Sequence, residues 1–158
     1  MPEVPTLGRR GGGWVLVQSV LIVLVPVTAI VGPGWPGALE PALRIAGGAL
    51  AVVGVASAAF AAWRLGRSLT PFPRPAETGR LVQDGPYRYV RHPVYTGGLL
   101  LCMGVTLAYS PLVLVPTALL ALVWALKTRV EERFLRTAYA EYDAYAARTR
   151  YRLVPFVY

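Results

Sequence analysis

The sequence predicts an all-α integral membrane protein with four transmembrane helices, the last two forming a tight hairpin and the fourth extending into the cytoplasm. Three observations favour this class. The 158 residues are 55% hydrophobic and only 15% charged, with a mean hydropathy of +0.49, which is too apolar for a soluble domain of this length. Four apolar runs approach the length needed to span a bilayer. The basic residues lie between and after these runs, as in cytoplasmic loops.

The first two spans are predicted at 14–31 and 41–63. The first run reaches the length that crosses a hydrocarbon core of roughly 30 Å, and no A-x-A site follows it, so we expect a retained span rather than a cleaved signal peptide. The loop at 32–37 has no basic residue, which places it outside. Small residues recur at helical spacing along the second span and predict a surface for close helix packing. They are Gly47, Ala51, Gly54, Ala58 and Ala62.

The third and fourth spans are predicted at 94–109 and 111–126, with Ser110-Pro111 as the hairpin turn. No helix breaker follows until well beyond Tyr145, so the fourth helix is expected to continue into a cytoplasmic helical tail over 127–158. Four spans place both termini in the cytoplasm. The composition, rich in Ala, Gly, Arg and Pro, suggests a bacterial cytoplasmic membrane.

The loop between the second and third spans is basic and rich in proline. Its arginines place it in the cytoplasm; they are Arg64, Arg67, Arg74, Arg80, Arg88 and Arg91. Residues 70–75, which we call the proline strap, contain three prolines and cannot form regular helix. We expect this strap to lie along the membrane surface, at the start of a cofactor-binding region over 70–98.

Polar residues are concentrated just before the third span, in the segment LVQDGPYRYVRHPVYTGG at 81–98. Pro93 suits the first position of a helix, where its missing N–H costs nothing. The N–H groups of Val94 and Tyr95 would then be unpaired at a helix N-terminus beside Arg91 and His92, which suits a carboxylate or phosphate. The alternative is that these residues only anchor the helix at the membrane interface.

Two acids, Glu131 and Glu132, lie where the fourth helix is expected to leave the membrane. Adjacent helical residues point about 100° apart, so at most one is expected to face the bundle centre, near Arg91 and His92, where it would accept hydrogen bonds from hydroxyls such as a ribose diol. The alternative is a solvated face with i,i+4 pairing to Lys127.

The remaining polar features indicate membrane rather than nucleic-acid or metal chemistry. The net charge of +8 is distributed as in a protein facing anionic lipids, not nucleic acid. The single cysteine, Cys102, excludes a disulfide framework, and no Cys/His spacing suits zinc. Tyr139, Tyr142 and Tyr145 are expected to dock a helix on the membrane or on the proline strap rather than to stack on a base.

In this order, segment 81–98, EERFL at 131–135, YAEYDAY at 139–145 and RLVP at 152–155 resemble the isoprenylcysteine carboxyl methyltransferase family and its relatives, the membrane phospholipid methyltransferases. The resemblance implies a membrane enzyme that uses S-adenosyl-L-methionine without the Rossmann fold. Consistently, no G-x-G-x-x-G motif follows a predicted strand in this chain. It implies cofactor contacts at Arg80, Leu81, Val82, Tyr87, His92, Pro93, Val94, Tyr95 and Glu131. It also implies that Lys127 is the basic residue on the substrate side. Lys127 and Arg91, either of which could orient an acidic acceptor head, are the candidate catalytic residues.

The resulting hypothesis is a methyltransferase that moves a methyl group by in-line displacement to a lipidic or membrane-embedded carboxylate, thiol or amine. A carboxylate or thiolate needs no general base, and none is obvious. Two alternatives remain. One is an NADPH-dependent membrane reductase of the sterol-reductase type. The other is a non-catalytic helical subunit that works through the small residues of the second span.

Overall fold

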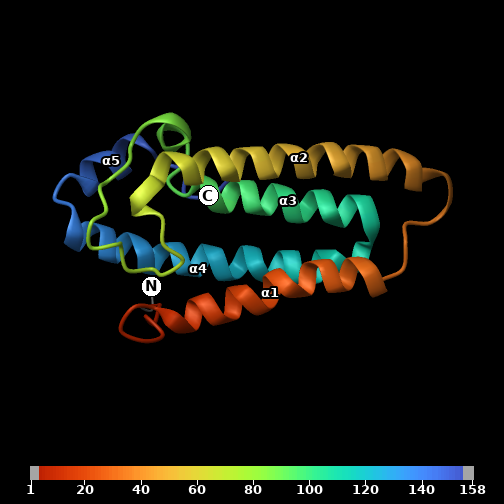
Figure 1. Cartoon of the computed structure of the whole chain (residues 1–158), viewed down its shortest axis with the longest axis horizontal. Helices are drawn as coiled ribbons and strands as arrows, with labels where there is room; N and C mark the ends of the chain where they lie inside the picture. Colours follow the sequence, from red (N-terminus) through yellow and green to blue (C-terminus); the bar gives the residue numbers. More distant parts are fainter. Residues whose placement is uncertain (1–3, 155–158) are drawn as a thin grey trace.

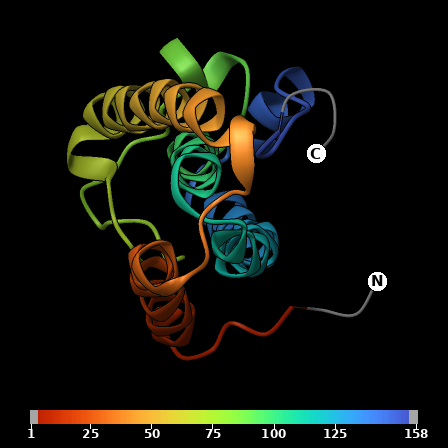
Figure 2. The same ribbon diagram turned by 90° about the vertical axis from the view of Figure 1, so that its right-hand side faces the viewer.

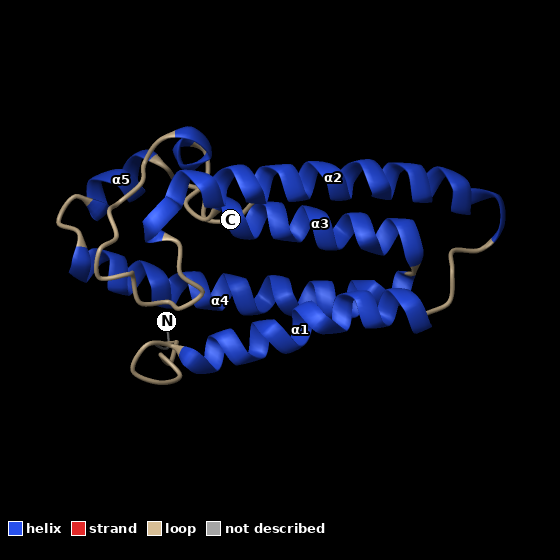
Figure 3. Cartoon of the chain, viewed as in Figure 1, coloured by secondary structure: helices blue, strands red, loops and turns tan. Residues whose placement is uncertain are grey.

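The computed structural model describes residues 4–154, and every regular element in this range is helical (Figures 1 and 3). The α-helices are α1 (Gly12–Val31), α2 (Glu40–Leu65), α3 (Pro93–Tyr109), α4 (Leu114–Ala138) and α5 (Tyr142–Arg148). Short 3-10 turns lie at Gly37–Leu39, Gly66–Ser68, Gly85–Arg88 and Pro111–Val113.

Three helical stretches are long and apolar enough to cross a membrane: Gly12–Val31, Gly37–Ser68 and Pro111–Ala138. The expected third span, α3, is a shorter apolar helix of 17 residues. The structure therefore supports the all-α membrane class.

The long helices lie roughly side by side (Figure 1). α2 packs along α3, whereas α1 packs mainly against α4. Seen end-on, α3 lies between α2 and α4, and the loop that follows α2 runs from α2 towards α1 (Figure 2). This loop contains the proline strap, so the strap reaches across one end of the bundle.

The close contact between α2 and α3 depends on glycine. A β-carbon on Gly47 would lie 2.5 Å from the carbonyl oxygen of Gly104, and one on Gly97 would lie 2.5 Å from the backbone nitrogen of Ala58. Neither position has room for a side chain, because the two backbones are in contact. The predicted packing surface on α2 is therefore confirmed. It is covered by α3 within the same chain, which removes it as the working surface of a non-catalytic subunit.

The predicted hairpin between the last two spans is also confirmed. α3 ends at Tyr109 and the next turn begins at Pro111. Ser110, which is fully buried, accepts a hydrogen bond at Oγ from the backbone N–H of Leu112 at 3.1 Å. The side chain therefore fixes the turn in place of a longer loop.

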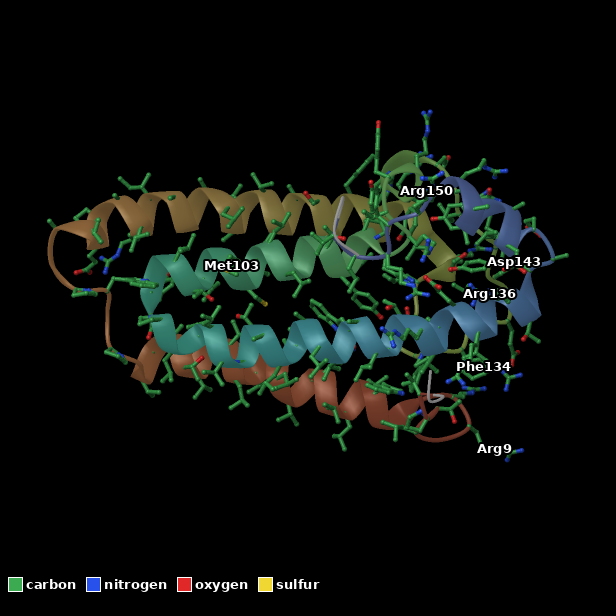
Figure 4. All side chains as sticks on the ribbon, turned by 180° about the vertical axis from the view of Figure 1, so that it is seen from behind. Arg9, Met103, Phe134, Arg136, Asp143 and Arg150 are labelled. Atoms are coloured by element: carbon green, nitrogen blue, oxygen red, sulfur yellow. The ribbon has the colours of Figure 1, made fainter. Side chains whose placement is uncertain are left out.

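The predicted helical tail is wrong beyond Ala138. At Tyr139 the backbone becomes extended, with φ −131° and ψ 113°, and α5 starts three residues later. Arg136 donates to Asp143 at 2.9 Å across this break, and the two side chains lie close together at the end of the bundle (Figure 4). No glycine or proline marks the break, so the sequence pattern does not show it.

After α5 the chain is extended and pairs with the loop that precedes α3. Val90 and Tyr151 form an isolated parallel bridge. The N–H groups of Arg91 and His92 donate to the carbonyls of Tyr151 and Arg152, each at 2.9 Å. These bonds satisfy backbone groups that a helix would have paired internally. Residues 155–158 of the predicted tail, and residues 1–3, lie outside the described residues.

Candidate functional site

A cavity of about 150 Å³ lies at the end of the bundle where polar side-chain atoms gather (Figure 4). The loop after α2, the segment before α3, the inner part of α4 and α5 all contribute to it. Its apolar lining is formed by Leu65, Leu69, Phe72, Leu81, Val82 and Leu135, and its polar lining includes Arg80, Arg91, His92, Tyr95, Glu131 and Tyr142. It therefore offers both an apolar wall and charged groups to a ligand.

Most of the site residues predicted from the sequence meet at this cavity. Those that line it are Arg80, Leu81, Val82, Tyr87, Arg91, His92, Val94, Tyr95 and Glu131. Pro93 is buried at the start of α3, where it opens the helix as predicted, and is not part of the lining. Lys127 is also outside the lining, and its side chain is fully enclosed.

The imidazole of His92 lies between the two acids of α4. Its Nδ1 is 3.3 Å from Oε2 of Glu131, and its Nε2 is 3.5 Å from Oε1 of Glu132. The side chain of Glu132 is fully buried and that of Glu131 is partly buried, with exposures of 0% and 12%. The expectation that at most one of them faces the bundle centre was therefore wrong. The two ring nitrogens of an imidazole point in different directions, so one His92 ring can lie next to two carboxylates that leave α4 at different angles.

These two carboxylates raise the pKa of His92. Burial by itself lowers the pKa of an imidazole, but the nearby carboxylates of Glu131 and Glu132 outweigh it, and the pKa of His92 rises above its usual value of 6.5. His92 therefore holds a proton more readily than a free imidazole does, beside two carboxylates that balance its charge.

Glu132 connects the segment before α3 to the residues that follow α5. Its Oε1 accepts from Nε of Arg91 at 2.8 Å and from Nε of Arg152 at 3.1 Å. Arg91 also donates to the carbonyls of Thr149 and Arg150, at 2.6 and 2.9 Å. Most of the donors of Arg91 are thus used within the protein, although the residue lines the cavity.

The N-terminus of α3 differs from the expected anion site. The N–H of Tyr95 donates to the carbonyl of His92 at 3.1 Å, as does that of Thr96 at 3.2 Å. The prediction that Tyr95 offers an unpaired N–H was therefore wrong. The helix tightens at its first turn so that the carbonyl of His92 takes both donors.

Tyr95 and Glu131 form the contact between α3 and α4 at the cavity. The hydroxyl of Tyr95 donates to Oε1 of Glu131 at 2.6 Å. The ring of Tyr95 stacks on Trp124 with centroids 5.0 Å apart and lies parallel to His92 at 5.9 Å. Glu131 is thereby held in one orientation, and a carboxylate has further lone pairs for a ligand.

The tyrosines of the tail take part in the site, which the sequence analysis did not expect. Tyr139, Tyr142 and Tyr145 all line the cavity. Tyr145 donates to the carbonyl of Tyr87 at 2.9 Å, so α5 is docked on the loop before α3. The hydroxyl of Tyr142 is buried and has no hydrogen-bond partner among the residues described. Burial raises the pKa of both tyrosines well above its usual value, so they remain neutral donors.

Gln18 of α1 is a second residue that the sequence analysis missed. Its Oε1 accepts from Nζ of Lys127 at 2.7 Å and from Nε1 of Trp124 at 3.2 Å. The available signal was an amide inside an otherwise apolar span, a type of residue that usually has a specific partner.

A family model described as phospholipid methyltransferase matches residues 43–142, which is more than half of the chain. The chain belongs to the phospholipid methyltransferase family. This family includes membrane proteins like the isoprenylcysteine carboxyl methyltransferases, so the resemblance found in the sequence is confirmed. Membership implies methyltransferase activity in general. The match covers α2, α3 and α4 and leaves α1 outside.

A curated relative is the cobalt-zinc-cadmium resistance protein CzcN of Cupriavidus metallidurans. The two sequences are 42% identical over 73 residues, which is 44% of this chain and 33% of CzcN. The chain thus matches about a third of the length of that relative.

Proposed function

We propose that this chain is an S-adenosyl-L-methionine-dependent methyltransferase that acts on a lipidic or membrane-embedded acceptor. The observation that carries the proposal is the cavity at which the start of α3 and the inner end of α4 meet, lined by Arg80, His92 and Glu131 in a member of a methyltransferase family. Membrane helices on one side and a polar loop on the other suit a polar cofactor and an apolar acceptor.

The residues of the cavity fit the chemical groups of this cofactor. Arg80 lines the cavity, and its backbone is fixed by Ser68, whose Oγ accepts from the N–H of Arg80 at 2.9 Å. A guanidinium there would hold the carboxylate of the methionine part. Glu131 would accept from the ribose hydroxyls or the amino group, and Leu81 and Val82 would cover the adenine.

When bound, S-adenosylmethionine supplies an electrophilic methyl group on a sulfonium. The work left to this chain is to hold the acceptor atom in line with that methyl and to exclude water. His92 lies between two carboxylates that favour its protonated form, so it is poorly suited to remove a proton from an acceptor. A carboxylate or thiolate acceptor reacts without proton removal, so this site favours these acceptors over a protonated amine.

Arg91 is the candidate contact for an acidic acceptor head, because it lines the cavity. We place four spans in the membrane, α3 included, with the cavity and both termini on the cytoplasmic side of a bacterial cytoplasmic membrane. The arginines around the proline strap support this orientation. The acceptor would enter between helices from the bilayer.

A thermal-shift experiment on the purified protein in detergent tests the proposal. S-adenosylhomocysteine, the product form of the cofactor, should raise the melting temperature, because a ligand that binds only the folded state stabilises it. NADPH should leave it unchanged. A shift with NADPH and none with S-adenosylhomocysteine would instead support the reductase alternative, and no shift with either would support a non-catalytic role.

A further inference from the structure

Lys127 is buried at a junction of three parts of the chain. Its Nζ donates to Oε1 of Gln18 on α1 at 2.7 Å and to the carbonyl of Pro71 in the proline strap at 2.8 Å. It lies 3.6 Å from Oε1 of Glu131 and 5.3 Å from the ring centroid of Tyr95. One ammonium therefore touches a membrane helix, the loop that covers the cavity and two residues that line the cavity.

The geometry of this junction does not suit a substrate-binding cation. The side chain of Lys127 has no exposed surface, and its hydrogen bonds to Gln18 and Pro71 use two of its three donors. The remaining side is occupied by Tyr95 and Glu131. A buried ammonium with good partners is costly to expose or to leave unpaired, so it holds its neighbours in place.

Gln18 is the contribution of α1 to this junction. Its side chain is 9% exposed, and its carbonyl oxygen takes protons from both Lys127 and Trp124. α1 lies outside the part of the chain that matches the family model and adds no residue to the cavity lining. Gln18 is therefore a polar residue in a largely apolar helix. Its two described partners, Lys127 and Trp124, both belong to α4, which helps to form the site.

We propose that Gln18 is a positioning residue of the cofactor site: it fixes the ammonium of Lys127, which in turn holds the proline strap over the cavity and holds Glu131 in its ligand-binding orientation. Lys127 is then a tether within the protein rather than the cation that meets the acceptor. The inference rests on the proposed function for its effect on cofactor affinity. Its effect on the strap does not depend on that function.

The test compares Gln18→Leu, which cannot accept a hydrogen bond, with Gln18→Glu, which can. Two quantities are measured: the dissociation constant for S-adenosylhomocysteine by calorimetry, and hydrogen exchange over residues 66–82. Gln18→Leu should weaken binding roughly tenfold, the loss typical of a hydrogen bond to a charged group, and should speed exchange in the strap. Gln18→Glu should restore both. Ser19→Ala, at an exposed position of the same helix, is the control and should change neither.

A double-mutant cycle with Lys127→Met decides whether Gln18 acts through Lys127. In the Lys127→Met background, Gln18→Leu should have no further effect on either quantity. Equal effects in both backgrounds would overturn the proposal, because Gln18 would then act through Trp124 or through helix packing. If Lys127→Met does not fold, the contrast between Gln18→Leu and Gln18→Glu decides, and identical behaviour of these two variants would overturn it.

Failure of this inference is distinguishable from failure of the proposed function. If the wild-type protein does not bind S-adenosylhomocysteine, the proposed function fails, yet non-additive effects of the two substitutions on strap exchange would still support the tether. If the wild-type protein binds and strap exchange is unchanged by Gln18→Leu, the tether fails and the proposed function stands.

Discussion

Arg91 donates a hydrogen bond to Glu132 at 2.8 Å, and this buried ion pair joins the loop before α3 to the inner end of α4. The exposed fractions of the two side chains are 9% and 0%. Glu132 does not line the cavity, whereas Glu131 does. The two adjacent acids therefore have different tasks: Glu131 faces the ligand site, and Glu132 holds the surrounding walls together.

Replacing Glu132 with alanine should be strongly destabilising. The change leaves Arg91 and Arg152 without their shared acceptor, and removal of one partner of a buried ion pair costs about 3–5 kcal/mol. Thermal unfolding in detergent measures the effect. Glu40→Ala is the matched control, because Glu40 pairs with Arg44 at 2.5 Å on the surface, where such pairs contribute about 0–1 kcal/mol. Equal melting temperatures for the two variants would contradict a structural role for Glu132.

The stability of the folded protein should depend on pH through the titration of His92. Burial lowers its pKa, but the nearby carboxylates of Glu131 and Glu132 outweigh this effect and raise the pKa in the folded protein above the usual 6.5. The folded state therefore binds the proton more tightly than the unfolded state does. This contribution is fully present below about pH 6.5 and is lost as the pH rises through the raised pKa.

The measurement is the difference in melting temperature between the wild-type protein and His92→Gln, recorded from pH 6 upwards. Glutamine does not titrate, so the subtraction removes the contribution of other groups to first order. The advantage of the wild-type protein should shrink as the pH rises. An advantage that stays constant or grows would show that His92 is not held as an imidazolium.

Two glycines on α2 should respond in opposite ways to alanine. A β-carbon on Gly54 would overlap the backbone of Leu101 and Gly97, whereas one on Gly48 would meet nothing within 4 Å. Alanine is favoured over glycine in helices by about 1 kcal/mol, so Gly48→Ala should be neutral or stabilising. Gly54→Ala should lose about 1–3 kcal/mol by forcing α2 away from α3. A similar thermal stability for both variants would mean that the two helices are not in close contact.

Replacing Tyr142 or Tyr145 with phenylalanine should distinguish a hydroxyl that contacts the ligand from one that stabilises the fold. Tyr145→Phe removes the hydrogen bond to the carbonyl of Tyr87 and should cost about 1 kcal/mol of stability. Tyr142→Phe removes a buried hydroxyl that has no partner among the described residues, so stability should be unchanged or higher. If this hydroxyl meets the cofactor, affinity for S-adenosylhomocysteine should fall nonetheless. An unstable Tyr142→Phe would indicate that the hydroxyl is bonded within the protein.

The sequence predicted those features that follow from local rules. Pro93 marks the start of α3 because its fixed φ suits a first helical turn. The small residues of α2 predict close packing because their spacing places them on one helix face. Nine of the eleven predicted site residues line the cavity, and eight of these nine lie in the one short segment 80–95.

Features that depend on contacts distant in the sequence were not predictable. No breaker residue marks the end of α4 at Ala138; the contacts found there are the Arg136–Asp143 pair and the docking of α5 on the loop before α3. The sequence did not show that both Glu131 and Glu132 lie next to His92. The geometry of α4 alone does not reveal that an imidazole from another segment lies between them. Gln18 and Lys127 are separated by 109 positions, and no local pattern relates them.

Calorimetric titration of the protein in detergent with S-adenosylhomocysteine tests the central claim most directly. Glu131→Gln keeps the size of a side chain that lines the cavity but removes its charge. Glu141→Gln makes the same chemical change at an exposed position. We predict saturable binding to the wild-type protein and to Glu141→Gln, and a dissociation constant at least about tenfold higher for Glu131→Gln. The absence of binding to the wild-type protein, or equal affinity in all three, would contradict the assignment of this cavity as the cofactor site.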